Sequence, residues 1–114
     1  MCIRDRHPIA IVPREAGVEL PEAEFLVVGH CCESGDILTT EPGNPEGLAV
    51  RSMLRPRIGD FAVVEGAGAY ASALAGKNYN SFPEAAEVML SRDGVPRLVR
   101  RRQTLEQMLQ NEVV

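Results

Sequence analysis

Tryptophan is absent from this chain, and aromatic residues make up only 4% of its 114 residues. No apolar run approaches the roughly 20 residues that cross a bilayer as a helix. A formal net charge of -4 argues against a nucleic-acid or anionic-membrane surface, because such surfaces need clustered positive charge. Few aromatic rings also argue against an OB-like barrel that stacks bases. We therefore expect no nucleic-acid partner and no membrane partner.

Cysteine is also scarce, with three residues in the chain, two of them adjacent at Cys31 and Cys32. Adjacent cysteines bridge only with strain and Cys2 would be left over, so we predict no disulfide framework. His30 precedes the pair, but this arrangement has no recognised zinc spacing and predicts no metal site. Free thiols are typical of a reducing compartment, and no apolar signal-peptide region is visible. We expect a cytoplasmic protein.

The composition is that of a soluble globular domain. Apolar residues make up 45% of the chain and charged residues 25%, and the length suits one domain. The first six residues, Met-Cys-Ile-Arg-Asp-Arg, fit nothing that follows, and we interpret them as translated sequencing-adapter read-through. Residues 7–114 are then the expected domain.

Short apolar or β-branched runs bounded by turn residues predict strands. They lie at residues 7–12, 22–29, 37–38, 61–65, 88–91 and 95–100. The run at 61–65 is continuous enough to be buried on both faces. The Pro- and Gly-rich segment at 41–47 predicts a loop, and residues 48–54 are ambiguous. Many short strands with little helix predict an all-β barrel or sandwich.

Two short helices are expected. One lies at residues 71–75 and ends at Gly76. The other begins at Thr104, which forms a capping-box pattern with Gln107 and is followed by apolar residues on one helical face. The intervening residues 78–81 predict a loop.

The segment from 81 to 90 carries conflicting signals. Ser81 and Glu84 have the spacing of a helix start. The pair Asp93-Gly94, however, is a strong hairpin signal that joins residues 88–91 to 95–100. We favour the hairpin over the helix.

The densest group of reactive side chains is Gly-His-Cys-Cys-Glu-Ser-Gly-Asp at residues 29–36. It combines thiols, carboxylates, a hydroxyl and an imidazole directly after an apolar run. A strand that ends in a polar turn projects side chains off the rim of a sheet, where functional groups usually lie. The alternative is a surface turn with two buried thiols.

Three motifs carry a resemblance to a known family. Cys-Glu-Ser-Gly-Asp at 32–36, Gly-Ala-Gly-Ala-Tyr at 66–70 and Asn-Tyr-Asn at 78–80 resemble the C-terminal domain of the diaminopimelate decarboxylases. These belong to the alanine-racemase-like amino-acid decarboxylases that depend on pyridoxal phosphate. The resemblance runs from about residue 7 to the C-terminus. It implies a Greek-key β-barrel that caps a cofactor-binding (β/α)₈ barrel, which would be missing here.

The resemblance also implies an activity, the conversion of meso-2,6-diaminopimelate to L-lysine and CO₂ in a homodimer with shared active sites. Pyridoxal phosphate would be held mainly by the missing barrel, so this chain alone is expected to be inactive. Lys77 does not match the family's cofactor lysine. Two alternatives stay open, a decarboxylase of the ornithine or arginine type and a stand-alone β-barrel interaction module.

Four residues take roles from the resemblance. Cys32 would be the acid that protonates the substrate carbon, and a thiol suits this role because it is mostly protonated at neutral pH. Glu33 would bind the distal ammonium of the substrate. Tyr70 would contact the cofactor phosphate and the substrate, and Asp36 would pair with a cation across the dimer interface. Asp36 could equally be an Asx-type turn residue.

Overall fold

The computed structural model describes residues 7–68, 71–73 and 75–113. It divides into two compact units, Met1–Ala75 and Gly76–Val114, which are described separately. The hexapeptide that we interpret as read-through lies outside the described residues, as do Tyr70 and Leu74.

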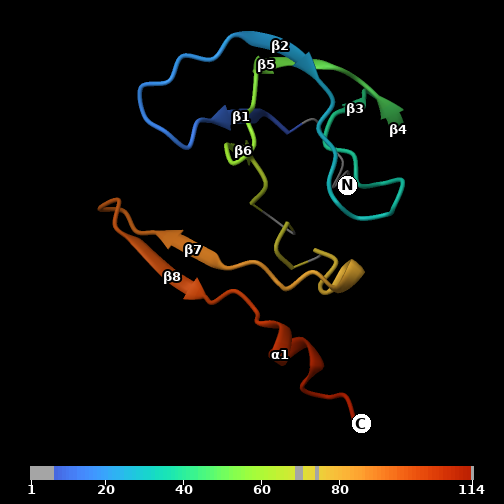
Figure 1. Cartoon of the computed structure of the whole chain (residues 1–114), viewed down its shortest axis with the longest axis vertical. Coiled ribbons are helices and arrows are strands. Elements are labelled where there is room, and N and C mark those ends of the chain that lie inside the picture. Colours follow the sequence, from blue (N-terminus) through green and yellow to red (C-terminus); the bar gives the residue numbers. More distant parts are fainter. Residues whose placement is uncertain (1–6, 69–70, 74, 114) are drawn as a thin grey trace. The chain divides into compact units, whose positions relative to one another are not determined.

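The first unit is built from strands that pair in a nested order (Figure 1). Its strands are β1 (Ile9–Val12), β2 (Glu22–Phe25), β3 (Thr40–Glu41), β4 (Asn44–Leu48), β5 (Arg51–Leu54) and β6 (Phe61–Val64). The β3–β4 hairpin lies in sequence between β2 and β5, which pair antiparallel, and these lie between β1 and β6, which also pair antiparallel. The first unit is therefore held together by pairings between distant segments.

The small core of this unit follows from side-chain alternation. Along β2, Glu22 and Glu24 are exposed while Ala23 and Phe25 face inward, as expected where successive side chains point to opposite faces. Met53 of β5 pairs with Ala23 and is 7% exposed, and Ile11 of β1 is equally buried. Two threonines that follow the 29–36 turn, Thr39 and Thr40, are also buried.

The second unit consists of a hairpin with short helices on either side in sequence (Figure 1). Its elements are the 3-10 helix η1 (Tyr79–Ser81), β7 (Glu87–Leu90), β8 (Pro96–Arg100) and α1 (Leu105–Leu109). Thr104 and Gln107 make both hydrogen bonds of the predicted capping box at the start of α1. This confirms the C-terminal helix.

The expected hairpin of β7 and β8 is confirmed, but its turn differs from the simplest two-residue form. Ser91 donates its N–H to the carbonyl of Val95 at 3.2 Å, which leaves three residues in the loop. Gly94 has a φ of 77°, a left-handed conformation that closes such three-residue loops.

An all-β fold with little helix is confirmed. The strands of the described residues form four separate two-stranded sheets rather than one closed barrel. The strand predicted at 22–29 ends at Phe25, and only an isolated bridge between Val28 and Ile37 continues the pairing. The run at 61–65 was expected to be buried on both faces, but Phe61 is 59% exposed. Among the described strands β6 pairs only with β1.

Three further local predictions were wrong. The segment at 41–47 is a hairpin, because Pro42 and Gly43 form a tight turn between β3 and β4. Proline followed by a glycine with a φ of 76° is the signature of a two-residue turn, which a loop-rich composition hides. Residues 71–73 form a turn instead of the predicted short helix, and η1 lies where a loop was expected. A helical run of five residues is marginal by itself, and the sequence at 71–75 has no capping-box pattern like the one that begins the equally short α1.

Candidate functional site

The turn at 29–36 is closed at its base by backbone contacts. Val28 and Ile37 form an isolated antiparallel bridge, and Gly29 donates its N–H to the carbonyl of Asp36 at 2.9 Å. A second hydrogen bond runs inside the turn, from the N–H of Asp36 to the carbonyl of Glu33 at 3.0 Å. The chain therefore leaves and re-enters the sheet at one place, and the residues between project from that edge.

The carboxylate of Asp36 contacts Cys31. Its Oδ2 accepts the backbone N–H of Cys31 at 2.7 Å, and its negative charge lies near the Cys31 thiol. Partial burial and then the nearby Asp36 charge raise the pKa of Cys31. Both effects disfavour the thiolate, so Cys31 stays protonated and unreactive at neutral pH.

The next two side chains point outward. Cys32 and Glu33 are both exposed, whereas Cys31 is half-buried. Neither Cys31 nor Cys32 is in a disulfide. The alternative interpretation, a turn with two buried thiols, is therefore wrong for Cys32. The turn can offer a proton donor and a carboxylate on adjacent residues to a molecule outside this chain.

Tyr70 and Lys77 are not part of this turn. Tyr70 lies outside the described residues, although Gly66 before it has a φ of 67° that favours glycine. Lys77 lies in the second unit, where its Nζ is 2.9 Å from Oε1 of Glu84. Sequence reasoning thus placed Cys32, Glu33 and Asp36 together correctly in one turn, and their roles stay predictions.

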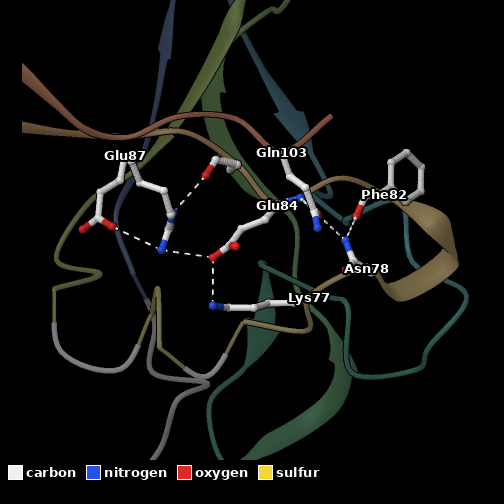
Figure 2. A network of polar contacts seen from close by, with 8 residues as sticks. Lys77, Asn78, Phe82, Glu84, Glu87 and Gln103 are labelled. Carbon is white, nitrogen blue, oxygen red and sulfur yellow. Dashed lines mark hydrogen bonds and ion pairs between the residues drawn. The ribbon is translucent and has the colours of Figure 1, made fainter. Parts of the chain in front are cut away.

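Glu84 is a polar centre of the second unit that sequence reasoning missed (Figure 2). Its Oε1 lies 3.0 Å from Nη1 of Arg100, in addition to the contact with Lys77. The backbone carbonyl of Glu84 accepts the N–H of Gln103, and the backbone N–H of Glu84 donates to the side-chain oxygen of Gln103. That oxygen also accepts from the side-chain amide of Asn78. Glu84 does not begin a helix, so its capping-box spacing was misleading. Gln103 has no recognisable local signal.

This network gives a pH prediction. A hydrogen bond from Lys77, followed by the charges of Arg100 and Lys77, lowers the pKa of Glu84, so its stabilising effect is present at neutral pH and is lost as the pH falls below the ordinary glutamate value of about 4.3. Glu84→Gln should lower the midpoint of thermal unfolding at pH 7 and flatten its decline toward pH 3.

The unfolding midpoints of parent and variant should converge as the solution is acidified, as measured by circular dichroism from pH 7 to pH 3. Glu112→Gln, at an exposed position of the same unit, is the matched control and should leave the decline unchanged. Parallel curves for Glu84→Gln and the parent would contradict the prediction.

Neither a metal-binding cluster nor a membrane-spanning helix occurs in the part of the chain that the structure describes. Across residues 7–68, 71–73 and 75–113, no group of three or more His, Cys, Asp or Glu side chains is placed to hold a metal ion. Within the same residues, no helix has the length and apolar character needed to cross a membrane.

Fold and site together define an all-β domain whose exposed turn presents a thiol beside a carboxylate. No family model matches the chain. The diaminopimelate decarboxylase of Escherichia coli strain K12 is 38% identical over 94 residues, which cover 82% of this chain and 21% of the relative. That of Buchnera aphidicola subsp. Baizongia pistaciae is 36% identical over 110 residues, or 94% of this chain and 25% of the relative.

Solved structures agree with these relatives. A crystal structure of diaminopimelate decarboxylase matches 93% of this chain with a TM-score of 0.77 and 35% identity, over 25% of its own length. The diaminopimelate decarboxylase from M. jannaschi matches 95% of the chain with a TM-score of 0.68 and 25% identity. The chain is therefore homologous to diaminopimelate decarboxylases over most of its length, and it spans about a fifth to a quarter of these relatives.

Proposed function

We propose that this chain is part of a pyridoxal-phosphate-dependent diaminopimelate decarboxylase, which converts meso-2,6-diaminopimelate to L-lysine and CO₂. The observation that carries the proposal is the exposure of Cys32 and Glu33 at the tip of one turn while Cys31 is half-buried. Homology to enzymes of that name supports the choice of reaction. A cytoplasmic location belongs to the same proposal, because the enzyme would need reduced thiols.

The chain's own residues fit a contributing role toward the cofactor rather than an anchoring one. Lys77 is the single lysine, and its Nζ lies 2.9 Å from a carboxylate oxygen of Glu84, so bonding to the cofactor aldehyde would have to break this ion pair. Tyr70 is proposed to contact the cofactor phosphate and the substrate. When bound, pyridoxal phosphate withdraws the electron pair that CO₂ leaves on the substrate.

Two side chains then act on the substrate itself. The Sγ–H of Cys32 donates a proton to the former α-carbon, which completes the replacement of the carboxyl group by hydrogen. The carboxylate of Glu33 accepts hydrogen bonds from the distal ammonium, a group that simpler amino acids lack. Adjacent positions on one turn suit these roles, because the reacting carbon and the distal ammonium belong to one extended molecule.

We also propose that the four small sheets belong to a Greek-key β-barrel in the complete protein, and that the protein is a homodimer with shared active sites. The nested pairing of β1 with β6 and of β2 with β5 supports the first point, because Greek-key folds bring strands that are distant in sequence together. Exposed apolar side chains such as Leu90, Leu105 and Leu109 support the second, because soluble proteins normally cover such surfaces.

A chimeric enzyme tests the reaction. Residues 7–114 would replace the homologous segment of the Escherichia coli relative, and the purified chimera should release CO₂ and L-lysine from meso-2,6-diaminopimelate. The 114-residue chain alone is the control and should form neither lysine nor a stable adduct between Lys77 and the cofactor.

Other outcomes of this assay point to the alternatives. Turnover of ornithine or arginine in preference to diaminopimelate would favour the other decarboxylase type. A chimera that folds and binds pyridoxal phosphate but has no decarboxylase activity would contradict the proposed function, and so would turnover by the chain alone.

A further inference from the structure

Gly29 is a glycine because of its neighbour Asp36. A methyl group built at Gly29 would overlap the two oxygens of the Asp36 carboxylate, so that carboxylate occupies the space that any side chain at position 29 would need. The φ of Gly29 lies outside the left-handed region, so alanine would fit the backbone itself. A side chain at position 29 would therefore have to displace the Asp36 carboxylate, although the backbone conformation itself would accept one.

The same aspartate reaches both neighbours of Cys32. Its carboxylate accepts the N–H of Cys31, and its backbone N–H donates to the carbonyl of Glu33. Its carbonyl accepts from Gly29 at the base of the turn. These contacts fix the residues before and after Cys32, and they leave the Cys32 side chain exposed.

We propose that Asp36, with Gly29 leaving room for its carboxylate, is a positioning residue that aims the Cys32 thiol out of the turn by holding Cys31 inward. We call these contacts of Asp36 with Gly29, Cys31 and Glu33 the clasp. The proposal rests on the proposed function for what Cys32 does. It differs from the role that the family resemblance implies for Asp36, an ion pair with a second subunit.

Three variants of the complete enzyme separate the clasp from an interface ion pair. Gly29→Ala displaces the carboxylate from the clasp but keeps its charge. Asp36→Asn removes the charge but keeps an oxygen that can accept the Cys31 N–H, and Asp36→Ala removes both. Gly76→Ala is the matched control, because a methyl group there meets only ordinary contact with Tyr79.

The clasp predicts that Gly29→Ala and Asp36→Ala reduce kcat by about ten- to a hundredfold with little change in KM, because a proton donor displaced by about 1 Å loses that much. Asp36→Asn should reduce kcat by a smaller factor, and Gly76→Ala should have the kcat of the parent. An interface ion pair predicts the opposite order, in which both Asp36 variants dissociate the dimer and Gly29→Ala has no effect.

A second readout does not depend on activity. Iodoacetamide should alkylate Cys32 faster than Cys31 in the parent, as measured by peptide fragmentation that assigns the label to each cysteine. In Gly29→Ala the ratio of the two rates should fall about fivefold or more, because Cys31 is released from Asp36. An unchanged preference in Gly29→Ala and Asp36→Ala would overturn the clasp. If the preference for alkylating Cys32 shrinks in these variants but the parent has no decarboxylase activity, the clasp is supported and the proposed function is overturned.

Discussion

Replacing Cys32 by alanine in the complete enzyme should reduce kcat by about 10²- to 10⁴-fold, the usual contribution of a positioned general acid. Binding of pyridoxal phosphate should be nearly unaffected, because the substitution removes only one exposed Sγ from the tip of a turn that other residues hold. The rate of lysine production measures kcat, and the absorbance of the bound cofactor measures the binding of pyridoxal phosphate.

The neighbouring thiol supplies the matched control. Cys31→Ser changes the same kind of atom one residue away and keeps a hydroxyl that can bind Asp36, so it should cost far less than Cys32→Ala. Equal losses in the two variants would mean that the turn tolerates neither change, and that the thiol of Cys32 has no particular role as an acid.

Mixed dimers extend this experiment to the proposed shared site. A Cys32→Ala subunit combined with a subunit that lacks its cofactor lysine should regain part of the activity, because one hybrid site then contains both intact groups. Heterodimers that form without any recovery of activity would show that Cys32 serves its own subunit, which would refute a site shared across the dimer.

The second large effect is expected for Glu33→Gln, which should lower kcat/KM for diaminopimelate by about 10²-fold or more, because a neutral amide no longer provides a charge-assisted hydrogen bond to the distal ammonium. The parent should strongly prefer diaminopimelate over 2-aminopimelate, which lacks the distal amino group. The variant should lose most of that preference.

Kinetics with both substrates measure this change in specificity. Glu24→Gln, at an exposed position of β2, is the control and should keep both rates. A uniform loss for both substrates would contradict the assignment, because losing a carboxylate that binds the distal ammonium should cost the substrate that carries this group far more than the one that lacks it.

Some elements could be predicted because their signals are local. The capping box at Thr104 and Gln107 lies within one helical turn, and the β7–β8 hairpin follows from Gly94 between two apolar runs. The same local view failed at 41–47, where a Pro-rich composition suggested a loop but Pro42 and Gly43 form a tight turn between strands. At 41–47 the local signals showed that the chain changes direction, but they did not show that strands pair across the change.

The sequence by itself determined which reactive groups are adjacent, since Cys32, Glu33 and Asp36 lie within five residues. Their directions were decided only by the tertiary structure. Cys31 turns inward and Cys32 outward because the bridge between Val28 and Ile37 closes the turn and brings the Asp36 carboxylate over position 29.

The long-range pairing also required the tertiary structure. In β1 and β6, residues Ile9 and Val64 become partners, although each strand by itself shows only an apolar run. Periodicity along a strand identifies the faces that need burial, whereas the choice of partner depends on the free energy of the whole arrangement, including the loops that the pairing closes. That choice sets where β2 lies, and thus where the turn at 29–36 leaves the sheet.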